Sequence, residues 1–255
     1  MSIDGPMPLL LAGLIFLFWG SFLNVLGYRL ISLDGIFRKY FFCPKCDAKL
    51  SFKEIIPVIS WLILKGRCSH CTRTISALYP FIEIFTSVVL LTLLKLHPDY
   101  FWPYFIFFSA LIITIRSDFE TMLISRFATL WLVPLGLIFS YFQIIPLTFL
   151  DSVLGALVGY AFPLIIAKTF LLIRKEEGMG EGDMDLLSFI GSFTGSIGAI
   201  MGLFGASFLG LFYIIFYGLI YKHIPRKFPF GPFIAIAAIL FVLFETQIWT
   251  IINSI

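Results

Sequence analysis

Residues 177–185 read Glu-Gly-Met-Gly-Glu-Gly-Asp-Met-Asp and stand between two long apolar runs. The run before this stretch ends in Arg174-Lys175, and the run after it begins at Leu186. Carboxylates at the mouth of a membrane helix cost free energy and are seldom without a function. Glycines at alternate positions let the backbone turn tightly and let a substrate chain approach closely. The stretch therefore predicts a functional loop at a membrane surface, between two helices.

The composition is that of a protein embedded in a membrane. Of the 255 residues, 60% are hydrophobic and 13% are charged, and the mean hydropathy is +1.00. Soluble globular domains carry about twice that share of charge. Apolar runs long enough for spans of about 20 residues predict an all-α polytopic fold. About eight transmembrane helices are expected, at roughly 8–30, 78–97, 100–117, 127–147, 149–173, 185–200, 201–221 and 231–253.

Glycines are frequent in the stretch from Leu186 to Tyr221. Small residues let membrane helices approach one another closely. Close helix packing is therefore expected at Gly191, Gly195, Gly198, Gly202, Gly205 and Gly210.

The basic residues predict the topology, because Lys and Arg concentrate in cytoplasmic loops. Nine of them lie at or in the long loop between the first two expected helices: Arg29, Arg38, Lys39, Lys45, Lys49, Lys53, Lys65, Arg67 and Arg73. Seven more flank loops on the same side of an alternating path: Arg116, Arg126, Arg174, Lys175, Lys222, Arg226 and Lys227. These loops are expected in the cytoplasm, with both termini, Asp4, Asp99 and Asp151 on the opposite side. The net charge of +3 reflects this topology and does not indicate nucleic-acid binding.

All four cysteines lie in the first expected cytoplasmic loop, as Cys43-Pro44-Lys45-Cys46 and Cys68-Ser69-His70-Cys71. Two Cys-x-x-Cys pairs about twenty residues apart have the spacing of a four-thiolate zinc site. A reducing cytoplasm argues against disulfides, whereas four free thiols or a dithiol redox pair remain alternatives. Four thiolates leave no open position for water, so a structural zinc is expected. His70 is expected to lie beside the site without ligating the metal.

Two aspartates are candidates for catalysis at the cytoplasmic face. Asp118 follows the apolar run 101–115, and Asp183 lies in the glycine-rich stretch. In an aspartic protease two carboxyl groups share one proton, so that one activates water while the other polarises the scissile carbonyl. Each aspartate alone is also compatible with a solvated charge at a helix end. Glu181 and Asp185 are expected to be solvated loop charges, with tuning of the pair as the alternative.

Glu83 is a third notable carboxyl group. It lies about one turn inside the second expected helix, after Tyr79-Pro80-Phe81. A buried acid at this depth needs a partner. A functional role and a purely structural pairing with a basic loop residue are both open.

Together these residues resemble the bacterial type IV prepilin peptidase family, the leader peptidase/N-methyltransferases with a Gly-x-Gly-Asp motif. The resemblance runs over most of the chain, in short motifs that keep one order. They include Gly20-Ser21-Phe22-Leu23-Asn24-Val25, the two cysteine pairs, Ile56-Pro57-Val58-Ile59-Ser60-Trp61, Tyr79-Pro80-Phe81-Ile82-Glu83, Gly178-Met179-Gly180-Glu181-Gly182-Asp183 and Phe230-Gly231-Pro232-Phe233.

The resemblance implies a bifunctional enzyme of the bacterial inner membrane. Such enzymes cut a basic leader from type IV prepilins or pseudopilins at the cytoplasmic face. They then methylate the new amino terminus with S-adenosylmethionine. Residues 1–97 would be associated with methyl transfer, and residues 98–255 would form the aspartic peptidase.

The resemblance also assigns residues to these activities. It implies catalysis by Asp118 and Asp183, with Gly180 and Gly182 supporting the loop. It implies zinc at Cys43, Cys46, Cys68 and Cys71. For the methyl-donor site the sequence offers only Glu83. The chain departs from the family's pattern at one point, where Ile124-Ser125-Arg126 stands in place of the usual Ile-Pro-Asp and is expected to alter how the next helix starts.

A transporter or channel and a non-catalytic scaffold are alternatives to a peptidase. In a transporter or channel, Asp118 and Asp183 would bind a proton or cation, but essential acids would then be expected nearer the bilayer midplane. In a zinc-anchored scaffold without catalysis, a glycine-flanked aspartate would have no role. The sequence does not indicate which pilin is the substrate, nor the oligomeric state.

Overall fold

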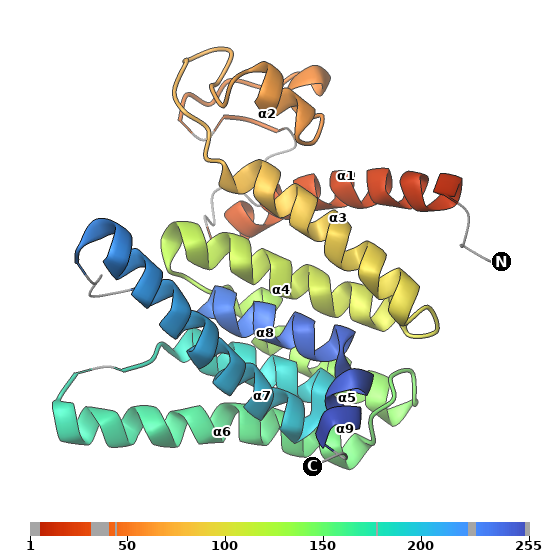
Figure 1. Cartoon of the computed structure of the whole chain (residues 1–255), viewed down its shortest axis with the longest axis vertical. Helices are drawn as coiled ribbons and strands as arrows, with labels where there is room; N and C mark the ends of the chain where they lie inside the picture. The colour runs from red at the N-terminus through yellow and green to blue at the C-terminus, as the bar shows by residue number, and fades with distance from the viewer. Residues whose placement is uncertain (1–5, 32–40, 44, 177, 224–227, 253–255) are drawn as a thin grey trace. The chain divides into compact units, whose positions relative to one another are not determined.

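The computed structural model describes residues 6–31, 41–43, 45–176, 178–223 and 228–252 (Figure 1). Several residues discussed above therefore lie outside the described part: Asp4, Arg38, Lys39, Glu177, Arg226, Lys227 and both termini. The chain forms two compact units, Met1–Pro98 and Asp99–Ile255.

The first unit is a helix pair with a loop between its members. Helices α1 (Pro6–Ile31) and α3 (Leu78–Leu96) pack against each other. A Cβ atom at Gly20 would lie 2.8 Å from the Glu83 Cα, so glycine is what permits this close approach. The loop holds a 3₁₀ turn, η2 (Phe52–Glu54), and a short helix, α2 (Ile59–Ile63). Its described residues, 41–43 and 45–77, are called the cysteine loop below.

In its described residues, the regular elements of the second unit are all helices. Its elements are α4 (Phe101–Thr121), η3 (Arg126–Ala128), η4 (Leu130–Leu132), α5 (Val133–Tyr141), α6 (Phe149–Arg174), α7 (Glu181–Tyr221), α8 (Gly231–Leu243) and α9 (Glu245–Ile252). Helix α8 packs against both α4 and α7, and α6 runs along α7 (Figure 1). Buried aromatic rings fill the core, with the Phe107 and Phe193 rings stacked at a centroid distance of 4.8 Å.

Helix α7 reverses direction at Gly195. This residue has φ 74° and ψ −179°, a non-helical conformation that is unfavourable for any residue with a Cβ atom. A Cβ atom at Gly202 would lie 3.7 Å from Leu187 Cδ2. In a straight helix these two residues would be about 22 Å apart. The element is therefore two arms that fold back on one another, a first arm from Glu181 and a second arm that ends at Tyr221.

Close contact between glycines joins α6 to the first arm of α7. A Cβ atom at Gly191 would lie 2.0 Å from the Gly155 carbonyl oxygen, and one at Gly159 would lie 2.2 Å from the Leu187 carbonyl oxygen. The expected packing through small residues is confirmed most strongly at Gly191. Gly202, in contrast, has space for a methyl group.

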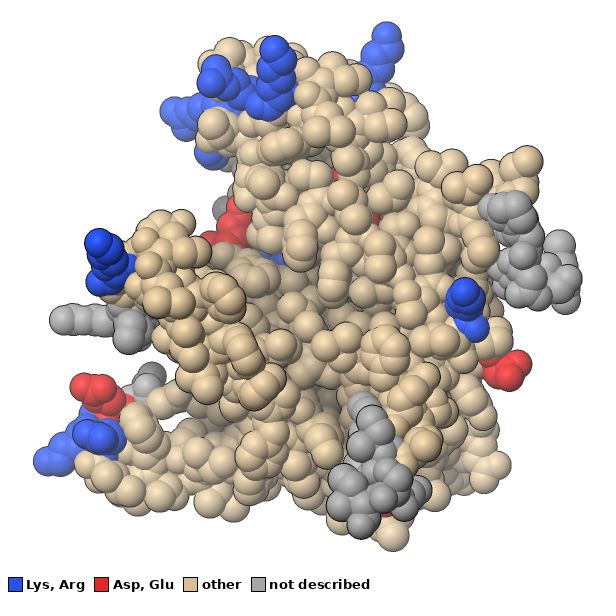
Figure 2. Space-filling model, viewed as in Figure 1, with Lys and Arg blue, Asp and Glu red and all other residues tan. Residues whose placement is uncertain are grey.

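Four helices of the described chain are long and apolar enough to cross a membrane: Met7–Ile31, Leu78–Leu96, Phe149–Arg174 and Glu181–Tyr221. Figure 2 shows Lys and Arg gathered over the cysteine loop and over helix ends of the second unit, while most of the visible surface carries no charge. The protein is thus an all-helical membrane protein. The number of eight spans stays a prediction.

Three expected helix boundaries are wrong. The expected break between residues 200 and 201 lies at Gly195 instead, because only this glycine adopts a positive φ within α7. The expected span 127–147 contains two 3₁₀ turns and the nine-residue α5, since Thr129 is non-helical with φ −127° and ψ −86°. The expected span 231–253 is divided between α8 and α9 at Phe244.

The glycine contact predicts a difference between two equally small substitutions. Gly191→Ala should lower the free energy of unfolding by about 1–3 kcal/mol, because the added methyl group forces α6 and α7 apart. Gly202→Ala should be neutral or stabilising, since the site is roomy and alanine favours a helix. Thermal unfolding of both variants in detergent micelles measures this difference. Equal melting temperatures would contradict the packing described here.

Candidate active site and metal centre

Asp118 lies in the last turn of α4 and is only 5% exposed. The backbone N–H of Gly231 donates a hydrogen bond to its Oδ2 atom, at 3.0 Å. Gly231 is the first residue of α8, where unpaired N–H groups and the helix dipole favour a carboxylate. A Cβ atom at Gly231 would lie 2.9 Å from the same Oδ2 atom. A residue larger than glycine would therefore crowd this contact.

Asp183 lies in the first turn of α7 and is partly buried. Ile124 contacts both Gly182, the neighbour of Asp183, and Gly231, the hydrogen-bond partner of Asp118. The fold therefore brings the helix ends that carry Asp118 and Asp183 to one place in the second unit. A Cβ atom at Gly182 would lie 2.9 Å from Ile124 Cβ, which explains a glycine there. Gly180 is the residue that precedes α7, and its extended backbone, φ −75° and ψ 150°, is open to any residue type.

The expectation of a solvated charge is wrong for Asp185, which is buried, whereas Glu181 is exposed as expected. Arg126 Nε donates to Asp185 Oδ2 at 2.9 Å, and Arg126 Nη2 donates to Glu181 Oε2 at 2.8 Å. Asp185 is 1% exposed, whereas Glu181 remains at the surface. These three residues are called the Arg126 clamp below. The sequence signal for it was the four-residue spacing of Glu181 and Asp185, which places both on one face of a helix.

Arg116, which the sequence placed beside a cytoplasmic loop, is buried in the structure. It is 1% exposed, two residues before Asp118 on α4, and it forms an ion pair with Glu120 one turn further on. Arg116 therefore belongs to the buried surroundings of the site, although the sequence marked it only as a topology residue.

The four cysteines converge in the cysteine loop. Their Sγ atoms all lie within 4.8 Å of one another, and none forms a disulfide. A tetrahedral zinc with Zn–S bonds of about 2.3 Å needs sulfur atoms about 3.8 Å apart. Four thiols at this spacing form a donor set that suits a closed, structural metal site. Four close cysteines fit a metal ion better than a single dithiol pair, which would leave two of them without a role.

The two cysteine turns have the same backbone geometry. Asp47 N–H donates to the Cys43 carbonyl and Thr72 N–H to the Cys68 carbonyl, each at 2.9 Å. Asp47 and Thr72 both have positive φ, 55° and 56°. Two turns of the same geometry thus direct their four Sγ atoms toward one common site between the turns.

Sequence reasoning missed Glu54, which ties the second cysteine turn to the segment that precedes α2. Its carboxylate accepts from Ser51 N and Oγ, at 2.6 and 2.7 Å, and from the Ser69 hydroxyl. The hydrogen bond from Ser69, reinforced by those from Ser51, lowers the pKa of Glu54 to about 2. His70 lies 3.9 Å from Glu54 and outside the set of four sulfur atoms. The Ser51-x-x-Glu54 capping pattern was the available signal.

Glu83 lies in the second turn of α3 and is 6% exposed. Its Oε2 atom accepts from Val58 N–H at 2.7 Å, and the Ser21 hydroxyl of α1 also donates to the carboxylate. Glu83 therefore joins α1, α3 and the cysteine loop just before α2. The predicted partner exists, but it is backbone and hydroxyl rather than a basic side chain.

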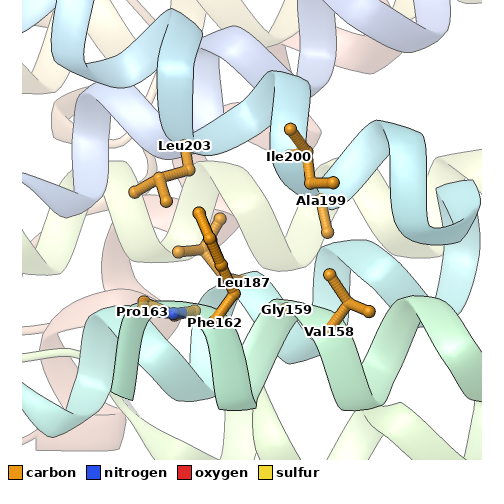
Figure 3. Close-up of a pocket in the computed structure, with 8 residues that line it drawn as sticks. All are labelled: Val158, Gly159, Phe162, Pro163, Leu187, Ala199, Ile200 and Leu203. Carbon is orange, nitrogen blue, oxygen red and sulfur yellow. The ribbon is translucent and has the colours of Figure 1, made fainter. Parts of the chain in front are cut away.

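An apolar crevice lies between α6 and both arms of α7 (Figure 3). It is lined by Val158, Gly159, Phe162, Pro163, Leu187, Ala199, Ile200 and Leu203. None of these side chains carries an acid, a base or a nucleophile. The crevice is therefore not a site of chemistry, and the paired aspartates at the helix ends are the candidate active site.

Comparison with known proteins agrees with this reading of the chain as a helical membrane peptidase. Residues 14–96 match the bacterial Peptidase A24 N-terminal domain, and residues 105–215 match the type IV leader peptidase family. The chain belongs to the type IV leader peptidase family. Each matched segment lies within one of the two compact units.

Several curated proteins named prepilin leader peptidase/N-methyltransferase are similar over nearly their whole length. The protein of Dichelobacter nodosus is 32% identical, over 95% of this chain and 94% of its own. That of Aeromonas salmonicida (strain A449) has the same identity and coverage. That of Neisseria gonorrhoeae is 28% identical, over 99% of this chain and 96% of its own. No solved structure matches the chain.

The cysteine cluster predicts the metal content of the protein. Protein purified without chelators should contain about one zinc per chain, held by four thiolates. Cys68→Ser should lower the zinc content measured by elemental analysis. His70→Ala is the matched control and should retain zinc, because this imidazole lies outside the sulfur cluster. Metal-free protein with four alkylatable thiols and unchanged activity would contradict the assignment.

Proposed function

We propose that this protein cleaves the basic leader of type IV prepilins or pseudopilins with Asp118 and Asp183, and then methylates the new amino terminus. The observation that carries the peptidase assignment is the convergence of these two carboxyl groups at the ends of α4 and α7. The names of the relatives support both activities.

The surroundings of the two aspartates support different roles for them. An N–H donor stabilises a carboxylate at the atom it contacts, and Gly231 supplies one to Asp118. Asp118 is thus suited to take a proton from the attacking water. Asp183, held in the first turn of α7, is suited to donate a hydrogen bond to the scissile carbonyl. The two carboxyl groups share one proton between them and exchange roles as the peptide bond breaks.

The topology proposed for this reaction places the active site in the cytoplasm. The basic residues of the cysteine loop, and Arg174, Lys175 and Lys222 in the second unit, would face the cytoplasm by the positive-inside rule. Both termini would then lie outside, and the protein would reside in the bacterial inner membrane with lipid around its apolar helices.

Methyl transfer is proposed for residues 1–97, with S-adenosylmethionine as donor and zinc in a structural role. The metal would be held by Cys43, Cys46, Cys68 and Cys71, and would fix the two turns of the cysteine loop to each other. Glu83 remains the candidate residue toward the methyl donor. Peptide-bond hydrolysis is proposed for residues 98–255 and requires no metal.

A transporter function has less support than a peptidase function. Asp118 lies in the last turn of α4 and Asp183 in the first turn of α7. Both are at helix ends, whereas coupling acids of transporters lie near the bilayer midplane. A scaffold without catalysis gives no reason for two adjacent carboxyl groups.

The proposed roles of the aspartates predict two inactive variants. Asp118→Asn and Asp183→Asn should each reduce leader cleavage by at least about 100-fold, because asparagine keeps the shape but cannot cycle a proton. Cleavage of a purified prepilin, followed by product mass, measures the effect. The control Asp99→Asn changes an exposed carboxylate and should retain activity. Near-normal cleavage by either active-site variant would overturn the assignment.

The proposed role of Glu83 predicts that the two activities separate. Glu83→Gln keeps an oxygen that can accept from Val58 N–H, so the loop should stay in place while the charge is lost. Methylation should fall more than cleavage and yield processed pilin with an unmethylated amino terminus. The mass of the mature product distinguishes the two forms. Equal loss of both activities, or loss of neither, would argue against a methyl-transfer role.

A further inference from the structure

The segment that follows α4 contacts each helix end of the candidate active site. Ile124 packs against Gly182 in the first turn of α7, where a Cβ atom would lie 2.9 Å from the Ile124 Cβ. The same side chain packs against Gly231 at the start of α8, where a Cβ atom would lie 2.8 Å from Ile124 Cδ1. Residues 124–126 therefore lie where the ends of α4, α7 and α8 meet.

Arg126 holds one face of the first turns of α7. Residues of an α-helix are about 100° apart around its axis, so Glu181 and Asp185 lie about 40° from each other and each about 160° from Asp183. The guanidinium contacts both carboxylates, at 2.8 and 2.9 Å. The helix face that Arg126 contacts is thus opposite to the face that carries Asp183.

We propose that Arg126 is a positioning residue for the peptidase, which fixes the rotation and position of the first turn of α7 so that Asp183 faces Asp118. This inference rests on the proposed catalytic role of the two aspartates. Arg126 forms its hydrogen bonds with Glu181 and Asp185 and not with Asp118 or Asp183. It acts through the turn that carries Asp183.

Because Asp185 is buried, loss of this ion pair should cost more free energy than loss of a surface salt bridge. The Asp185 side chain is 2% exposed, while the Arg126 side chain is 55% exposed. A buried carboxylate that loses its cationic partner is strongly unfavourable, so the structure around it must move to let water in. That movement would occur at residue 185, within two residues of Asp183.

The clamp also balances charge beside the active site. Glu181, Asp183 and Asp185 place three carboxyl groups in the first five residues of α7. Arg126 neutralises two of them through a forked guanidinium, which a lysine ammonium cannot reproduce with the same two-pronged geometry. Without this cation, repulsion between Glu181 and Asp185, one helical turn apart, would weaken the turn.

The test compares single and double charge reversals in a prepilin cleavage assay. Arg126→Glu and Asp185→Arg should each reduce kcat by about 100-fold with little change in KM, since a small displacement of a catalytic group has an effect of this size. The double variant Arg126→Glu/Asp185→Arg restores an ion pair of reversed polarity and should recover cleavage to within about tenfold of the parent protein. The arginine introduced at position 185 can also pair with Glu181 one turn earlier.

Two further variants keep the result interpretable. Arg126→Lys retains the positive charge but not the two-pronged guanidinium, so its kcat should fall between those of the parent and Arg126→Glu. This variant remains informative even if the charge-reversed double variant fails to fold. Arg174→Gln, at the exposed end of α6, is the matched control and should cleave normally. Melting temperatures of all variants report whether the fold is intact.

The outcomes separate this inference from the proposed function. Normal kcat in Arg126→Glu or in Arg126→Lys, with Asp183→Asn inactive, would overturn the role of Arg126 and leave the catalytic pair standing. A double variant that is folded but as inactive as the single variants would also overturn it. Activity in Asp183→Asn would instead overturn the catalytic pair.

Discussion

The hydrogen bond from Gly231 N–H to the Asp118 carboxylate is the contact on which the candidate site depends. It joins the end of α4 to the start of α8 across 113 residues of sequence. A carboxylate at the start of a helix is stabilised by unpaired N–H groups and by the helix dipole. Because residue 231 is a glycine, the donor and acceptor can approach to 3.0 Å without a side chain between them.

The packing of α6 against α7 holds the helix that carries the other aspartate, Asp183. Gly155 and Gly191 let the two backbones touch, and the reversal at Gly195 returns the second arm of α7 toward Leu187. In a membrane, where the hydrophobic effect does not drive helices together, such close backbone packing is a main source of association. Asp183 thus lies at the start of a helix that packs closely against α6 at Leu187 and Gly191.

The first unit depends on polar contacts of another kind. Glu83 connects the backbone of the cysteine loop to α3 and α1, and Glu54 connects the second cysteine turn to the segment before α2. A loop of this size has little apolar core, so these hydrogen bonds contribute more to its stability than they would in a larger domain. Among the described residues, the donors to Glu83 are a backbone amide and a hydroxyl, whereas the sequence had suggested a basic loop residue.

The sequence by itself determined the class of protein, and it indicated the cysteine cluster and the two candidate aspartates. These features depend on local properties: the length of apolar runs, the spacing of cysteines and the residues beside each aspartate. The tertiary structure decided which glycine reverses α7, which partner Glu83 has, and that Arg126 pairs with Asp185. The last contact spans 59 residues, and the reversal depends on which of the eight glycines of α7 adopts a positive φ. Local pattern cannot specify such features, because they arise from the free energy of packing whole helices against one another.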